Sequence, residues 1–65
     1  GQVENGRLTL TATVPMNAAG EIWVPARFGM VGTVPQGATL LRQTDAATVY
    51  ATGPGSFTFM TEGRK

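Results

Sequence analysis

The feature that most constrains this chain is the strict alternation of apolar and polar residues over positions 7–14, RLTLTATV. Successive side chains of an extended strand point to opposite sides, so this segment has one apolar face and one polar face rich in threonine. A period of two with β-branched residues predicts a half-buried β-strand. The apolar face is formed by Leu8, Leu10, Ala12 and Val14.

The pair Asn5-Gly6 comes directly before this strand. Both residue types accept a positive φ, so the pair is well suited to a two-residue hairpin turn. Only residues 1–4 are left to form the strand that enters the turn, and so short a strand can pair with only half of residues 7–14. We therefore expect a domain that is incomplete at its N-terminus, as if it were cut within a hairpin.

Two Val-Pro pairs, in TVPMNAAGEIWVPA (residues 13–26), end the strand at 7–14 and the apolar run that follows it. Proline has no amide N–H to donate to a sheet, so Pro15 and Pro25 are expected at strand ends or edges. Between them, Asn17 and Gly20 are typical turn residues, and EIWV (21–24) alternates as a second strand.

The remainder of the chain repeats this pattern of short strands and turns. Residues 26–34 predict either a bulged strand or an irregular crossover, because Gly29 and Gly32 interrupt an apolar run. PQG (35–37) predicts a type I turn with proline second and glycine fourth, and GPG (53–55) predicts a tight turn. Further strands are expected at 38–43, 47–52 and 56–61, with Phe57 and Phe59 in the core.

Together these segments predict one all-β domain over residues 1–65, a small antiparallel β-sandwich of about five strands. A chain of this size buries little surface, and small domains often compensate with disulfides or a metal. This sequence has 0 Cys and 0 His, so it lacks the usual ligands for either. We therefore expect a protein surface to supply the missing stabilisation.

The charge pattern limits the partners further. The net charge is +1, and only 14% of the residues are charged. No basic patch interleaved with aromatics is present, which argues against nucleic acid and against a membrane surface as partners. No segment is long and apolar enough to be a transmembrane helix.

The Pro-terminated strands and the Asn-containing corner in NGRLTLTATVPMNAAGEIWVP, with the Gly-rich start of the closing strand in GPGSFTF, resemble the C-terminal β-sandwich domain of bacterial α-L-rhamnosidases. The resemblance covers nearly the whole chain and is weakest over residues 26–46, where TVPQGATLLRQ departs from the family pattern. It implies a parent glycoside hydrolase that removes terminal α-L-rhamnose, with its acid and base in a separate helical domain. This chain would brace or cover that catalytic domain, as a truncated fragment without activity of its own. The matching positions are Val14, Pro15, Asn17, Trp23, Val24, Pro25, Gly53, Gly55, Ser56, Phe57, Thr58 and Phe59.

No catalytic constellation is evident in the residues. An inverting glycosidase needs two carboxyl groups about 6.5–9.5 Å apart in a cleft. The four carboxylates, Glu4, Glu21, Asp45 and Glu62, lie beside turns, strand ends or termini, and solvated edge charges are the simpler interpretation. With no His or Cys, a nucleophile and a metal site are not expected, and no cofactor is expected.

The aromatic residues leave an alternative open. Trp23 and Tyr50 are each opposite the more aliphatic face of their strand, so they are expected on one outer sheet face, with Phe28 as a further candidate. They would form either a sugar-stacking platform, making this a carbohydrate-binding module for rhamnose-containing glycans, or a contact with the catalytic domain. A third hypothesis is an unrelated, self-contained small β-barrel, and self-assembly through exposed strand edges is a fourth.

Overall fold

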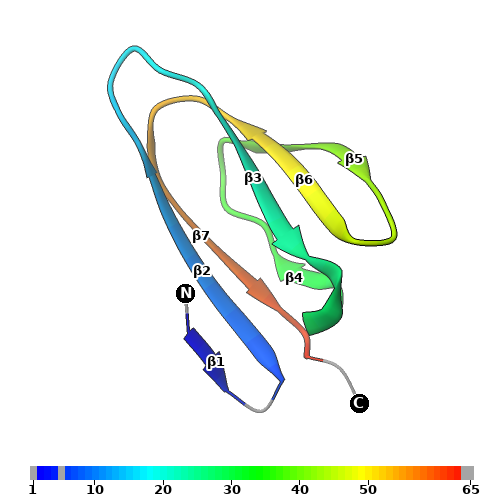
Figure 1. Ribbon diagram of the computed structural model, residues 1–65. Coiled ribbons are helices and arrows are strands. Elements are labelled where there is room, and N and C mark those ends of the chain that lie inside the picture. Colours follow the sequence, from blue (N-terminus) through cyan, green and yellow to red (C-terminus); the bar gives the residue numbers. More distant parts are fainter. Residues whose placement is uncertain (1, 5, 64–65) are drawn as a thin grey trace.

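The computed structural model describes residues 2–4 and 6–63 and contains two antiparallel sheets that face each other across one core (Figure 1). The four-stranded sheet has the order β1 (Gln2–Glu4), β2 (Arg7–Val14), β7 (Gly55–Thr61), β4 (Val31–Thr33). The three-stranded sheet has the order β3 (Gly20–Pro25), β6 (Ala47–Thr52), β5 (Ala38–Gln43). A single turn of 3-10 helix, η1 (Ala26–Phe28), follows β3.

The predicted all-β antiparallel sandwich is therefore confirmed, but the described residues contain seven strands rather than about five. The two additional strands, β1 and β4, have three residues each. β1 is the short strand expected to enter the Asn5-Gly6 turn, and β4 lies within residues 26–34, where a bulged strand was one of the two expected forms. Three residues are too few to display an alternating pattern, so periodicity alone identifies neither strand.

The two sheets are two halves of one folded ribbon. β2 pairs with β7 and β3 pairs with β6, so the segment from β2 to β3 runs antiparallel to the segment from β6 to β7 in both sheets. β4 and β5 add a third strand on the far side of β7 and β6. Three connections therefore lead from one sheet to the other: residues 15–19, 53–54 and 34–37, in the order of the strands that they join (Figure 1).

Two of these connections contain the same kind of turn. In Pro15–Ala18 and in Pro35–Ala38, the amide of the fourth residue donates to the carbonyl of the proline, at 3.2 Å in both. The third residues, Asn17 and Gly37, have φ of 65° and 95°. A positive φ at the third position belongs to a type II turn, so the predicted type I turn with proline second and glycine fourth is wrong.

The core lies between the sheets and receives side chains from both. Leu8, Phe57 and Phe59 come from the four-stranded sheet. Ile22, Val24 and Tyr50 come from the three-stranded sheet. The rings of Tyr50 and Phe59 have centroids 4.9 Å apart and an interplanar angle of 38°, so this pair joins the two sheets. The predicted core positions of Phe57 and Phe59 are confirmed.

At the opposite end of the sandwich, η1 and a short irregular segment connect the sheets before β4 begins. Gly29 has φ of 90°, and a Cβ at this position would lie 2.3 Å from the carbonyl oxygen of Gly63. Only glycine fits there. The register of β4 also shifts between Val31 and Thr33, so residues 26–34 contain both an irregular crossover and a short bulged strand, the two forms that the sequence left open.

The N-terminal hairpin has the expected form. β1 pairs with the first part of β2, from Glu4 opposite Arg7 to Gln2 opposite Thr9. Gly6 has φ of 76°, as the predicted turn requires, whereas Asn5 lies outside the described residues. Within the described ranges, residues 10–14 have β7 as their only strand neighbour. The proposed truncation itself stays a prediction.

Candidate functional site

Trp23 lies on the outer face of the three-stranded sheet, directly opposite Val49 of β6. Its side chain is 53% exposed, while its neighbours Ile22 and Val24 are buried in the core. The alternation of EIWV therefore places Trp23 and Glu21 outside, as predicted.

Tyr50 does not lie on this outer face with Trp23. Tyr50 pairs with Ile22, points into the core and is only 5% exposed, so the predicted sharing of an outer face with Trp23 is wrong. The reason is that β6 is covered on both sides, with Val49 and Tyr50 buried on opposite faces. Burial raises the pKa of the Tyr50 hydroxyl above its ordinary value of 10.0.

Phe28 occupies a third location, in η1, where it is partly buried and packs against the core. The guanidinium carbon of Arg27 lies 4.9 Å from the centre of its ring. The three candidate aromatics are thus dispersed, and they do not form one platform.

Arg42 joins Trp23 instead, because β5 contains a bulge. Leu40 pairs with Tyr50, but Arg42 pairs with Val49, so Leu41 is an extra residue in the ladder. Without the bulge, Arg42 would pair with Thr48 and point to the inner face. With it, Arg42 lies on the outer face, across Val49 from Trp23.

The three outer residues Glu21, Trp23 and Arg42, here called the Trp23 cluster, contact one another. The Trp23 indole N–H and the Arg42 Nη2 both donate to Glu21 Oε1, at 3.3 and 3.4 Å. The guanidinium carbon of Arg42 lies 5.1 Å from the centre of the Trp23 ring, within range of a cation–π interaction. Since the Glu21 and Arg42 side chains are 48% and 45% exposed, their ion pair contributes little to stability.

Val49 forms the base of this cluster. It is 0% exposed although it faces away from the main core, and Trp23 and Arg42 are its neighbours on the two adjacent strands. A fully buried valine on an outer face shows that the cluster covers the sheet there. The sequence indicates Trp23 but not Arg42, because no residue pattern in ATLLRQ marks the bulge that reorients Arg42.

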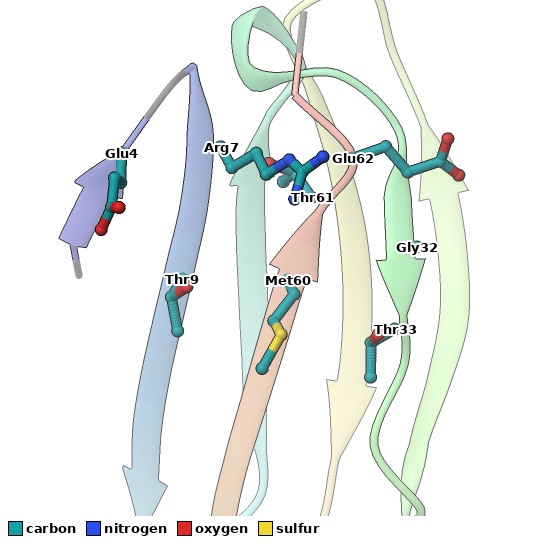
Figure 2. A pocket seen from close by; sticks show the side chains of 8 residues that line it. All are labelled: Glu4, Arg7, Thr9, Gly32, Thr33, Met60, Thr61 and Glu62. Atoms are coloured by element: carbon teal, nitrogen blue, oxygen red, sulfur yellow. The ribbon is translucent and has the colours of Figure 1, made fainter.

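The outer face of the four-stranded sheet carries an open groove of about 720 Å³. Figure 2 shows the Arg7 side chain reaching across from β2 toward β7, above Met60, while the carboxylates of Glu4 and Glu62 point away at the two sides. A Cβ on Gly32 would lie 2.9 Å from Glu62 Cγ, so the glycine makes room for that side chain. The groove is lined by Glu4, Arg7, Thr9, Gly32, Thr33, Met60, Thr61 and Glu62.

The carboxylates are distributed over the molecule. Glu4 and Glu62 border the groove, Glu21 is on the other sheet, and Asp45 lies between β5 and β6. All four are exposed, whereas a glycosidase holds its acid in apolar surroundings in a cleft. In the described part of the chain, no group of three or more His, Cys, Asp or Glu is placed to hold a metal ion.

Comparisons of the chain with protein-family models, with curated proteins and with solved structures return no match. Among residues 2–4 and 6–63, no helix is long and apolar enough to cross a membrane.

Proposed function

We propose that this chain is a non-catalytic C-terminal β-sandwich domain of an α-L-rhamnosidase-like glycoside hydrolase, and that it braces the catalytic domain of the same polypeptide. The proposal is carried by one observation. Several of the residues that resemble this family occupy strand ends, crossings between the sheets and core positions, where the fold restricts the choice of side chain.

β2 ends at Val14, and Pro15 begins one crossing between the sheets. Gly53 begins the crossing beside it, and Gly55 begins β7. Pro25 ends β3. Phe57 and Phe59 continue from the second crossing into the core. Landmarks that coincide with strand ends, crossings and core positions support a shared fold more strongly than scattered surface matches would.

A bracing role is supported by the edge strand β5. Leu40 and Leu41 are 56% and 49% exposed, and Val34, just before this strand, is 46% exposed. Apolar side chains along an open sheet edge are typical of a surface that another protein covers. In this proposal the catalytic domain of the parent polypeptide covers them.

The test begins with the polypeptide that carries the sequence. An antibody raised against the chain should precipitate, from the producing cells, a protein far larger than 6.8 kDa that hydrolyses p-nitrophenyl α-L-rhamnopyranoside. The purified chain alone should not hydrolyse this substrate, because its four carboxylates are exposed, and the two that line one groove, Glu4 and Glu62, point away from it (Figure 2). A single 6.8 kDa species, or turnover by the isolated chain that disappears in Glu21→Gln or Asp45→Asn, would overturn the proposal.

A further inference from the structure

We propose that the Trp23 cluster is a binding site for one neutral pyranose residue of a glycan. This inference does not rest on the rhamnosidase assignment. It follows from the placement of an exposed indole, a carboxylate and a guanidinium on one rigid sheet face.

The indole supplies the apolar part of the site. The C–H face of a pyranose ring stacks on an aromatic ring, and the gain is largest where the ring is already held in place. Trp23 is held by the indole N–H bond to Glu21 Oε1 and by Arg42, whose guanidinium carbon lies 5.1 Å from the ring centre on one side. About half of its surface, 53%, stays exposed, so the sugar would stack on the part of the ring that Arg42 does not cover.

The polar part of the site can form hydrogen bonds with the hydroxyl groups of a sugar. Glu21 Oε1 accepts from both Trp23 and Arg42, and its Oε2 is in neither of these contacts. A sugar hydroxyl can donate to Oε2, and the neighbouring hydroxyl can accept from a guanidinium N–H that does not contact Glu21. A carboxylate and a guanidinium side by side therefore suit two adjacent hydroxyls of one ring.

The charge of the cluster selects a neutral sugar. Glu21 and Arg42 form an ion pair, so the cluster has no net charge to attract an anion. The carboxylate of a uronic acid would approach that of Glu21, and like charges brought together disfavour binding. We therefore commit to a neutral pyranoside as the occupant.

The experiment uses ¹⁵N-labelled chain and follows amide and indole resonances during titration. Trp23 is the only tryptophan, so its indole N–H gives a single, assignable signal. Methyl α-L-rhamnopyranoside and methyl β-D-glucopyranoside are the neutral probes, and sodium glucuronate is the anionic probe. We expect at least one neutral probe to saturate with a Kd of about 1–10 mM, as one small ring stacked on an open face allows. Glucuronate should bind at least about threefold more weakly.

Three variants test the assignment of residues. Trp23→Ala should weaken binding of the saturating probe by about tenfold or more, read from the amides of β3 and β6. Glu21→Gln and Arg42→Gln should each weaken it by about three- to tenfold, because each removes a charge-assisted hydrogen bond. The matched control is Arg27→Gln, which removes the other arginine held over an aromatic ring, 4.9 Å above Phe28, and should leave the affinity unchanged.

Each outcome of these titrations either supports or overturns the inferred sugar site. Glu21 and Arg42 are exposed, so their variants are expected to stay folded even where Trp23→Ala does not. Failure of both neutral probes to saturate would overturn the inference, as would equal binding by the wild type and Arg42→Gln. A Trp23 signal that moves only when the chain is part of a larger polypeptide would identify the cluster as a protein contact instead. The size of the parent polypeptide, which tests the bracing role, is independent of all these results.

Discussion

The two buried threonines, Thr52 and Thr61, differ mainly in whether the side-chain hydroxyl has a hydrogen-bond partner. Thr61 Oγ1 accepts the amide N–H of Leu8 at 2.8 Å, whereas Thr52 Oγ1 is buried with no hydrogen-bond partner among the described residues. The two side chains are 5% and 4% exposed. A buried polar atom without a partner carries its full desolvation cost, while a bonded one recovers it.

The same substitution should therefore have opposite effects at the two positions. Thr52→Val should raise the free energy of unfolding by about 1 kcal/mol, because it replaces an unpaired hydroxyl with a methyl group of similar size. Thr61→Val should lower it by about 1–3 kcal/mol, because the buried amide of Leu8 loses its acceptor. Urea denaturation of the two variants beside the wild type measures both changes, and changes of equal sign would contradict this account.

Tyr50 makes the stability depend on pH at the alkaline end. Burial raises the pKa of its hydroxyl above 10.0, so the folded state holds its proton more tightly than the unfolded state does. This contribution is fully present below pH 10 and is lost as the pH rises from about 10 through the folded-state pKa.

We expect the urea midpoint of the wild type to fall more steeply above pH 10 than that of Tyr50→Phe. The comparison with the variant is needed because the chain also contains one lysine, and lysine side chains ordinarily titrate in this range. Tyr50 is the single tyrosine, so the absorbance of tyrosinate follows its ionisation directly. Parallel curves for the two proteins would show that Tyr50 does not contribute.

The reversed position of Tyr50 shows what alternation cannot decide. In ATVYAT the two faces carry Val49 and Ala51 on one side and Thr48 and Tyr50 on the other, and hydrophobicity alone predicts that the aliphatic side faces the interior. The structure places Tyr50 inside because it pairs with Ile22 and meets Phe59 from the other sheet. A central strand that is buried on both faces gives no polar side from which the orientation can be inferred.

Among the elements, β5 is the one most exposed to other molecules. All its residues from Thr39 to Gln43 are exposed, and it forms an edge of the three-stranded sheet. An edge with unpaired backbone groups and exposed leucines can pair with a second chain. We expect the isolated chain to self-associate at high concentration through this strand.

A lysine on this edge should abolish the association. Leu41→Lys adds a charge to the exposed bulge position, and its cost in stability should be within about 0.5 kcal/mol. The matched control is Met60→Lys, which adds the same charge at a 46% exposed position on the central part of the other sheet. Sedimentation equilibrium should show a monomer for Leu41→Lys and unchanged association for Met60→Lys. If both variants associate as the wild type does, β5 is not the contact.

The longer elements were predictable because their pattern is local. The strands at 7–14, 47–52 and 56–61 have the predicted limits to within a residue, since alternation and flanking glycines or prolines define them. The bulge in β5 was not predictable, because it depends on which residue of β6 lies opposite Leu40 and Arg42. The Trp23 cluster could not be assembled from the sequence for the same reason.

At the scale of the whole molecule, one thin core supports both sheets. The folded ribbon encloses one small core filled by side chains from both sheets, and no disulfide or metal site is found among the described residues to add to it. A domain of this size seldom gains more than about 3–5 kcal/mol from its core. The fold class followed from composition and alternation, but the pairing of residues 7–25 with 47–61 is a long-range property that no local pattern contains.

Because the core supplies most of this small stability, we expect the free energy of unfolding to depend on Phe59 more than on any outer-face residue. Phe59 and Val49 are both 0% exposed, but Phe59 joins the two sheets through Tyr50, whereas Val49 is covered on the outside of one sheet. Phe59→Ala should cost about 3–5 kcal/mol, which equals the whole stability expected for the domain, so the variant should be largely unfolded at 25 °C. Val49→Ala removes two methyl groups, should cost about 1–2 kcal/mol, and should stay folded. Amide chemical-shift dispersion separates the two cases, and a folded Phe59→Ala beside an unfolded Val49→Ala would mean that the outer face, not the interior, holds the sandwich together.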